Sequence, residues 1–457
     1  MRATTDPSLR SFIDVPPQSP FPIQNLPYGV FRPEPAAPPR VGVAIGEWVL
    51  DLSVLEERGF FGGPELAGKS VFRQPTLNAF AALGPAAWHE AREQISRLLR
   101  HDVTLLRDDL ALRDQALVAL DSVEMCLPLA IADYTTFAAA PDLATDQGAG
   151  SGSDAQRDKD LAHPSKSRSH SVGRESDGAG VPVSPAARRG LAHYAPVGRA
   201  ERAGSIVVSG TAISRPLGLI LSDAQSLACQ PTRELDCELH LGFFIGRGNQ
   251  LGRPIPISRA PNQIFGYVLV AAWWARDFQR CETDAGIVFA SRNFATTISP
   301  WVVSPAALEP FCCVGPPESP DPPSYLRGKM PRHIDLHFEI ALHAAEAEAP
   351  CVLSRPDSRN LYWSPVQLIA QHTINGCGLR PGDLIGVGPL DGPSRDAAAS
   401  LCSLTRRGRE PVRLSDGRVR TFLEDGDTVI LTGWCEGGEY RIGFGDCRGT
   451  VAPAPLI

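Results

Sequence analysis

The sequence at residues 267–270 reads Tyr267-Val268-Leu269-Val270, a short run of aromatic, β-branched and aliphatic side chains. Runs of this kind recur along the chain, and many are flanked by Gly, Pro or Asp, residues that end strands and form turns. The other runs are at residues 41–43, 206–208, 243–245, 429–432 and 440–444. Short strands that alternate with turns predict a fold that is mainly β.

Two segments instead show the spacing of an amphipathic helix. The first spans residues 76–99, and the second spans residues 364–375, where Gly376 provides a stop signal. The apolar positions of the first segment are Leu77, Phe80, Leu83, Trp88, Ile95 and Leu98. We therefore expect one long helix in the N-terminal quarter and a shorter one near the C-terminus.

The composition limits the classes of protein to consider. With 457 residues, the chain is long enough for two or three domains, and 43% hydrophobic with 21% charged residues is ordinary for a soluble globular protein. The formal net charge of −7 argues against nucleic acid as a partner. No apolar stretch approaches the roughly 18 residues of a transmembrane helix, so we expect no membrane span.

The N-terminus and the cysteines predict a cytoplasmic protein. The first residues lack the basic-then-apolar pattern of a secretory signal. The eleven cysteines are scattered without a CxxC pair, and their number is odd, which is typical of reduced thiols.

Residues 146–192 differ in composition from the rest of the chain. They consist largely of Gly, Ser, Asp, Arg, Lys, Ala and Pro, with almost no large apolar side chains. Such a segment cannot bury enough surface to offset the entropy lost on ordering, so we expect a disordered insertion. It could be an accreted or mis-spliced insertion, an artefact of the gene model, or a regulatory or partner-binding segment.

Several ordered motifs span nearly the whole chain outside that insertion. They include Phe21-Pro-Ile-Gln-Asn-Leu-Pro-Tyr-Gly-Val-Phe31, Asp133-Tyr-Thr-Thr-Phe-Ala-Ala-Ala-Pro-Asp-Leu143, Leu251-Gly-Arg-Pro-Ile-Pro-Ile-Ser258, Thr296-Thr-Ile-Ser-Pro-Trp301, Asn375-Gly-Cys-Gly-Leu-Arg-Pro-Gly-Asp383 and Tyr440-Arg-Ile-Gly-Phe-Gly445. In content and order these motifs resemble fumarylacetoacetase. The resemblance implies a small SH3-like β-barrel with a following helix at residues 1–115. It also implies a large β-roll at residues 116–457, which carries the active site and forms a homodimer.

The resemblance also implies a reaction, the last hydrolysis of tyrosine and phenylalanine breakdown. Members of the family cleave the carbon–carbon bond of 4-fumarylacetoacetate to release fumarate and acetoacetate. A calcium or magnesium ion polarises the carbonyl and stabilises the leaving group. A histidine oriented by a carboxylate deprotonates the attacking water.

The four carboxylate positions of the family's metal site fall on Thr136, Glu238, His240 and Ala272. Only Glu238 is an acid, so we expect calcium or magnesium to bind weakly or not at all. A pair formed by Glu238 and His240 could instead favour a softer ion such as zinc or manganese. Alternatively, His240 is an inward polar residue that is hydrogen-bonded to Glu238.

The base and the oxyanion positions have changed as well. The family's histidine falls on Leu143, its orienting glutamate on Ser403, and its lysine on Arg292. Arginine keeps the charge of that lysine but presents a planar fork in place of a compact ammonium group. Other substrate-contact positions of the family fall on Ala138, Thr283 and Pro389.

Some substrate-binding positions of the family persist, namely Arg202, Arg276, Gln279 and Thr296. Arg276 could hold a carboxylate through two hydrogen bonds, which suggests a small dicarboxylate or diketo acid as ligand. Alternatively, Arg276 pairs on the surface with Asp277 or Glu282.

These substitutions predict a fumarylacetoacetase-like protein whose hydrolase activity is lost or strongly reduced. One alternative is a C–C hydrolase that is still active on fumarylacetoacetate or on another β-diketone or β-keto acid. Another is a non-catalytic subunit that pairs with an active paralogue.

Overall fold

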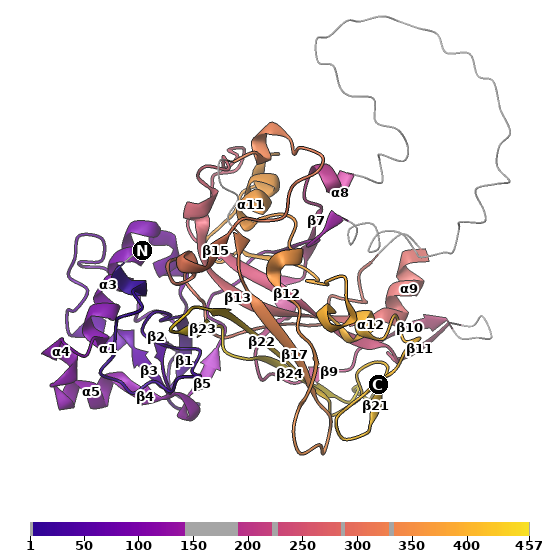
Figure 1. The fold of residues 1–457 in the computed structure, drawn as a ribbon, viewed down its shortest axis with the longest axis horizontal. Helices are drawn as coiled ribbons and strands as arrows, with labels where there is room; N and C mark the ends of the chain where they lie inside the picture. Colours follow the sequence, from indigo (N-terminus) through magenta and orange to yellow (C-terminus); the bar gives the residue numbers. More distant parts are fainter. Residues whose placement is uncertain (1–2, 142–190, 222–226, 285–287, 329–332, 457) are drawn as a thin grey trace, which may run out of the picture.

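A computed structural model describes residues 3–141, 191–221, 227–284, 288–328 and 333–456. Figure 1 shows an N-terminal unit of strands and helices beside a larger body built mainly of strands. The prediction of a mainly β protein is thus confirmed. The predicted insertion lies outside the described residues up to residue 190. Its last two residues, Leu191 and Ala192, belong to helix α8 (Leu191–Tyr194), so this edge of the prediction was wrong.

The N-terminal unit is organised around an antiparallel sheet of five strands, in the order β4-β3-β2-β1-β5. The strands are β1 (Tyr28–Arg32), β2 (Arg40–Ile45), β3 (Trp48–Asp51), β4 (Leu117–Ala119) and β5 (Glu124–Cys126). Helices α1 (Leu52–Glu57), α4 (Thr104–Arg107) and α5 (Leu110–Ala116) accompany them. β4 and β5 follow the boundary predicted at residue 115, yet they pair with β3 and β1. The N-terminal sheet therefore extends to Cys126, and the SH3-like closure stays a prediction.

The single helix predicted at residues 76–99 was wrong, because the segment forms two helices. These are α2 (Asn78–Leu83) and α3 (Pro85–Leu99). Gly84 separates them with a φ of +95°, a conformation that suits glycine. Pro85 has no backbone N–H to continue α2, but it is suited to the first turn of α3.

Two sheets make up most of the C-terminal body. The first contains seven strands in the order β7-β6-β19-β12-β13-β14-β8. These are β6 (Tyr134–Phe137), β7 (Gly198–Glu201), β8 (Ile206–Val208), β12 (Leu235–Ile245), β13 (Ile264–Ala275), β14 (Thr296–Ile298) and β19 (Leu384–Val387). The second has the order β18-β17-β22-β24-β9, and β23 also pairs with β22. Its strands are β9 (Ile213–Ser214), β17 (His337–His343), β18 (Cys351–Ser354), β22 (Thr428–Glu436), β23 (Arg441–Gly443) and β24 (Cys447–Ala452).

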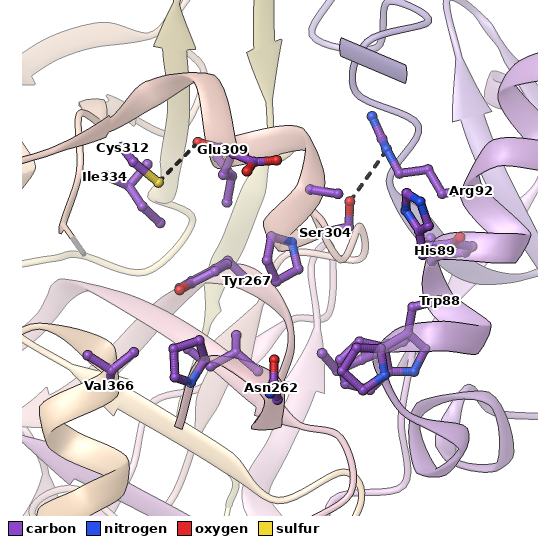
Figure 2. Close-up of a pocket in the computed structure, with 18 residues that line it drawn as sticks. Trp88, His89, Arg92, Asn262, Tyr267, Ser304, Glu309, Cys312, Ile334 and Val366 are labelled. Atoms are coloured by element: carbon purple, nitrogen blue, oxygen red, sulfur yellow. Dashed lines mark hydrogen bonds between the residues drawn. The ribbon is translucent and has the colours of Figure 1, made fainter. Parts of the chain in front are cut away.

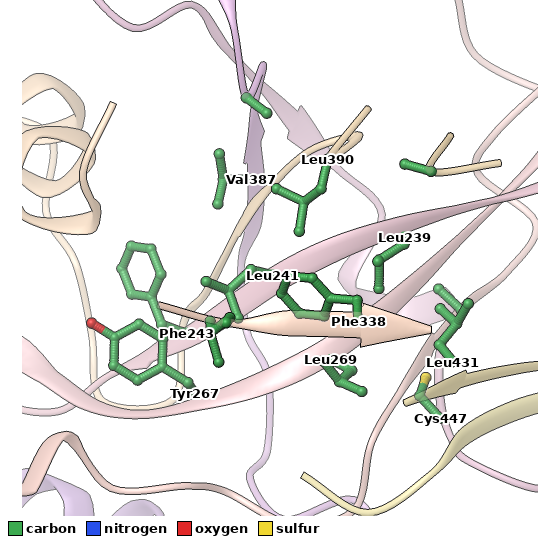
Figure 3. Packing of buried hydrophobic residues seen from close by; sticks show 14 of the residues in the cluster. Leu239, Leu241, Phe243, Tyr267, Leu269, Phe338, Val387, Leu390, Leu431 and Cys447 are labelled. Carbon is green, nitrogen blue, oxygen red and sulfur yellow. The ribbon is translucent and has the colours of Figure 1, made fainter. Parts of the chain in front are cut away.

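Apolar side chains from both sheets form the main core (Figure 3). The labelled members include Leu239, Leu241 and Phe243 of β12, Leu269 of β13, Phe338 of β17 and Leu431 of β22. Successive side chains of a strand point to opposite faces. Because Leu239 and Leu241 face this core, Glu238 and His240 face the other side of the sheet. The alternation along β12 therefore separates the core from the polar positions.

Smaller elements complete the described structure. The second predicted helix is confirmed as α11 (Pro365–Thr373), where Ser364 and Gln367 form a capping box. α9 (Arg276–Asp284) follows β13 directly, and β10 (Leu217–Leu221) pairs with β11 (Leu227–Pro231). Within the described ranges, each helix is too short or too polar to span a lipid bilayer. All eleven cysteines are free thiols, as expected.

Candidate active site

Two neighbouring strands form the floor of the candidate site. β12 places Asp236, Glu238 and His240 on one face, because the three residues alternate along the strand. The antiparallel register puts Glu238 opposite Ala272 of β13, and Asp236 opposite Trp274. Two of the predicted metal-ligand positions, Glu238 and Ala272, are therefore direct neighbours across the strands.

Both carboxylate oxygens of Glu238 already have partners. Oε1 accepts a hydrogen bond of 2.6 Å from Nη2 of Arg276, and Oε2 lies 2.9 Å from Nε2 of His240. A Cβ atom at Gly388 would lie only 2.4 Å from Cγ of His240, so the absence of a side chain there makes room for the imidazole. The alternative in which His240 is hydrogen-bonded to Glu238 is the one that the structure has.

Arg276 connects the acids of this site. Its Nε and Nη2 donate to Oδ2 of Asp236 at 3.0 and 2.6 Å, and its Nη1 donates to Gln279 at 3.1 Å. The guanidinium also lies 4.7 Å from the centre of the Trp274 indole. These contacts occupy the N–H groups of the Arg276 guanidinium that were predicted to bind a ligand carboxylate. A substrate-binding role for Arg276 and Gln279 stays a prediction that would require these contacts to rearrange.

The predicted surface pairing of Arg276 with Asp277 or Glu282 was wrong. Asp277 is buried and accepts hydrogen bonds from the Thr232 hydroxyl and the backbone N–H of Arg233. Glu282 accepts instead from backbone N–H groups at residues 289–291. Arg276 turns inward because Asp236 and Glu238 offer two buried carboxylates, whereas Asp277 is already engaged.

Burial and the nearby Arg276 charge shift the pKa values of Asp236 and Glu238 in opposite directions. Burial raises the pKa of Asp236 above its usual value, although the Arg276 charge opposes this. Burial also acts to raise the pKa of Glu238, but the charge of Arg276 and the hydrogen bond with His240 outweigh it. The pKa of Glu238 therefore lies well below its usual range. Glu238 is thus a stable carboxylate whose charge is balanced by protein groups.

A second ion-paired group also packs against Trp274. Arg292 forms an ion pair with Glu201, and the Thr136 hydroxyl donates to the same carboxylate at 2.5 Å. The guanidiniums of Arg292 and Arg199 lie 4.3 and 5.6 Å from the centre of the Trp274 indole. Burial and the nearby Arg292 charge lower the pKa of Arg199 to about 10. Thr136 and Arg292, two predicted site positions, therefore meet at Glu201.

The predicted base positions contribute little. Leu143 lies outside the described residues. Ser403 is exposed, and its hydroxyl donates to Oδ2 of Asp391 at 2.9 Å. Burial raises the pKa of Asp391, and the charges of Glu238 and Asp236 add to this effect. Asp391 is an acid near the site that the sequence reasoning missed, because it is far from Glu238 along the chain.

The remaining predicted positions are dispersed around the site. Arg202 is exposed after β7, and the described structure records no side-chain ion pair from it to this cluster. Thr283 bonds back to the carbonyl of Gln279 within α9, at 2.7 Å. Thr296 is buried on β14 and pairs with Ala272 across the strands. Of these three residues, Thr296 is therefore the one that lies near Glu238, because Ala272 is the cross-strand neighbour of both.

Sequence reasoning also missed Asp236 and Trp274 as site residues. Asp236 precedes Glu238 by two positions, so the period of a strand could have indicated it. Trp274 could not have been assigned in this way, because its role depends on three guanidiniums that come from different segments.

The residues present do not fit the cation that the resemblance implies. Calcium or magnesium would require about six oxygen ligands, several of them charged. Glu238 is bonded to Arg276 and His240, and Ala272 has no donor atom. Within the described part of the chain, no group of three or more His, Cys, Asp and Glu residues could hold a metal ion. The softer-ion alternative lacks ligands for the same reason.

Comparison with known proteins defines the class as a two-domain hydrolase fold. Residues 24–128 match the family description "Fumarylacetoacetase N-terminal", and residues 183–452 match "Fumarylacetoacetate (FAA) hydrolase C-terminal". The chain is 41% identical to the fumarylacetoacetase of Arabidopsis thaliana over 98% of this chain and 99% of that protein. It is also 41% identical to the human fumarylacetoacetase, over 98% and 99% of the two chains.

The chain therefore belongs to the fumarylacetoacetase family. The resemblance inferred from the motifs is confirmed over nearly the whole length of these relatives. The altered site residues consequently lie within a preserved family framework.

Proposed function

We propose that this protein is a fumarylacetoacetase-family member in which the hydrolysis of fumarylacetoacetate is lost or strongly reduced. The observation that carries the proposal is the position of Arg276. Its guanidinium lies 2.6 Å from Glu238, the only acid left among the four predicted ligand positions. The family's role in tyrosine breakdown is then not the role of this chain.

The reaction requires groups that the described site does not supply. Cleavage of a carbon–carbon bond needs a base for water, a polarised carbonyl and a stabilised carbanion. Ser403 cannot orient an imidazole as a carboxylate does, and the Glu238 charge is already compensated by Arg276. Loss of a general base typically lowers the rate by about 10² to 10⁴. Loss of a metal removes several kcal/mol of charge stabilisation, although the two losses need not be additive.

The direct test is a cleavage assay with purified full-length protein and fumarylacetoacetate. The assay is run with and without added calcium or magnesium, and the Arabidopsis fumarylacetoacetase serves as positive control. We expect a turnover lower than that of the control by about 10² or more. A turnover within tenfold of the control would instead establish an active C–C hydrolase and overturn the proposal.

A cation measurement separates loss of the base from loss of the metal. We expect elemental analysis of dialysed protein to find no stoichiometric calcium, magnesium, zinc or manganese. A stoichiometric divalent ion would contradict our account of Glu238 even if the turnover were low.

One observation favours a second candidate function, that of a non-catalytic subunit. The hairpin of β10 and β11 exposes Leu219 and Leu227, whose side chains are 58% and 63% exposed. The pairing of Leu219 with Cys229 and of Leu221 with Leu227 puts Leu219 and Leu227 on one face of the hairpin as diagonal neighbours. A contiguous exposed apolar patch can mark a contact surface. Such a surface would fit the homodimer that the resemblance implies, or a heterodimer with an active paralogue. Native mass spectrometry after co-expression with that paralogue distinguishes the homodimer from the heterodimer.

A further inference from the structure

A cavity that shares no lining residue with the candidate active site lies between the two halves of the chain (Figure 2). Its volume is about 170 Å³. Trp88 and His89 of helix α3 line it from the N-terminal half, and Asn262 and Tyr267 line it from the C-terminal half. The His89 side chain is 44% exposed, and Asn262 is exposed as well, so the cavity opens to the surface. A small molecule can therefore enter without unfolding either half.

Aromatic rings form much of the cavity wall. Trp88 is only half-buried, and its indole N–H donates to the carbonyl of Phe80 at 3.1 Å, which fixes the orientation of the ring. The rings of Trp88 and Phe265 meet edge to face, with centres 5.4 Å apart, and Tyr267 adds a further ring to the lining. Such walls favour an aromatic ligand, because rings pack well in edge-to-face and offset-stacked arrangements.

Asn262 provides an accessible hydrogen-bonding group at this cavity. It belongs to the short helical turn η4 (Ala260–Gln263), and Figure 2 shows its side chain pointing toward the space between Tyr267 and Trp88. Among the described residues, no hydrogen bond holds its side-chain amide. A primary amide offers both N–H donors and a carbonyl acceptor, so the matching group on a ligand is another amide.

The charges in the lining favour a ligand without net charge. Arg92 lines the cavity, and its guanidinium donates to the carbonyls of Gln24 and Asn25, both at 2.6 Å. Glu309 lines the same cavity with the opposite charge. An anion would lose hydration beside Glu309, and a cation would lose hydration beside Arg92, so an uncharged ligand is favoured.

We propose that this cavity binds an uncharged molecule with a single aromatic ring and a carboxamide group. An engineered protein cavity of about 150 Å³ is known to hold benzene, so the volume suits one ring with a small substituent. The ring packs among Trp88, Phe265 and Tyr267. The ligand amide donates to the side-chain carbonyl of Asn262 and accepts from its N–H group. The site is independent of the proposed loss of hydrolase activity.

The first test compares three probes that share a ring and differ in charge, by isothermal titration calorimetry on the full-length protein. Benzamide is neutral, benzoate is an anion and benzylammonium is a cation. We expect benzamide to bind more tightly than either ion by about tenfold or more, because each ion must give up hydration to enter the cavity.

Three variants then locate the benzamide site. Asn262→Leu should weaken benzamide binding by about five- to tenfold, the usual contribution of one hydrogen bond. Gln250→Leu is the matched control, because it removes an exposed amide outside the cavity lining, and the affinity should not change. Ala306→Phe places a ring in the lining, which should weaken binding by about tenfold or more. Circular dichroism confirms that each variant is folded.

Three results would overturn the proposal. They are no binding of benzamide at millimolar concentration, an affinity for benzoate or benzylammonium equal to that for benzamide, and unchanged benzamide binding in Asn262→Leu. If Ala306→Phe fails to fold, the comparison of Asn262→Leu with Gln250→Leu still decides the question.

Discussion

The cluster around Glu238 and the hydroxyl of Tyr28 are both buried and both polar, yet they differ in whether their polar groups have partners. In the cluster, Arg276 connects Asp236 to Glu238, and His240 bonds to the remaining carboxylate oxygen. The Tyr28 hydroxyl, by contrast, has no hydrogen-bond partner among the described residues.

The difference shows which of the two regions has its buried polar groups satisfied. A buried carboxylate with its charge balanced offers little to an incoming cation, because the new ion must displace an existing guanidinium. A buried donor without an acceptor carries an uncompensated desolvation penalty, which its removal relieves. Mutations in the two regions should therefore change stability in opposite directions.

The largest effect is expected for Arg276→Met. The variant leaves Asp236 and Glu238 buried without their cation, which should lower the free energy of unfolding by about 3 to 5 kcal/mol. Urea denaturation at neutral pH measures the change. The matched control is Arg280→Met, whose guanidinium pairs with Glu234 and is 64% exposed. The free energy of unfolding of the control should fall by less than about 1 kcal/mol. Equal losses in the two variants would contradict the conclusion that Arg276 neutralises the buried carboxylates of Asp236 and Glu238.

A somewhat smaller effect is expected for Glu238→Gln, and it should depend on pH. At neutral pH the variant should lose about 3 kcal/mol, because Arg276 and His240 lose a charged partner. The pKa of Glu238 in the folded protein lies below the value of 4.5 for a free glutamate. Its contribution is therefore fully present above pH 4.5 and is lost as the pH falls below that value.

The measurement for Glu238→Gln is urea denaturation of the wild type and the variant at neutral and at acid pH. The difference between the two proteins should shrink on acidification. Asp236, whose raised pKa acts in the opposite sense, is present in both proteins, so the part of its contribution that comes from burial cancels in this difference. A difference that grows with acid would show that Glu238 is not held as a carboxylate.

The third prediction concerns the return of ligands to the site, in the double variant His240→Glu and Ala272→Asp. Ala272 is the direct neighbour of Glu238 across the strands, so the change brings three carboxylates together. Calcium should then stabilise the variant by about 1.4 to 2 kcal/mol when the free ion exceeds Kd by about ten- to thirtyfold. The neutral control is His240→Gln with Ala272→Asn. Thermal denaturation with and without calcium provides the comparison, and equal stabilisation of the wild type would reveal a cation site there already.

The smallest effect is expected for Tyr28→Phe in the absence of ligand. Removal of an unpartnered buried hydroxyl should raise the free energy of unfolding by about 1 kcal/mol. The control is Tyr440→Phe, whose hydroxyl donates to the Thr5 carbonyl at 3.2 Å and whose loss should cost about 1 kcal/mol. Urea denaturation measures the change in the free energy of unfolding of both variants. A loss of stability in Tyr28→Phe would mean that its hydroxyl already has a partner.

Much of the fold could be predicted from local patterns. The short apolar runs became strands, and Ser364 and Gln367 cap helix α11 as their spacing indicates. The break between α2 and α3 could also have been predicted, because Gly84 and Pro85 both interrupt a helix. The extension of the N-terminal sheet to β5 could not, since it depends on pairing between Val30 and Cys126, which are far apart along the chain.

The linear order of residues was enough to establish the family, the mainly β architecture and the loss of acids at Thr136, His240 and Ala272. The family follows from the ordered motifs and their resemblance to fumarylacetoacetase, the architecture from strand periodicity, and the lost acids from the positions that this resemblance assigns. The partners of Arg276 and the missing partner of the Tyr28 hydroxyl depended instead on how distant strands and helices pack. The physical reason is that an ion pair or a cavity is a property of distances, and segments far apart in the chain acquire those distances only when the chain folds.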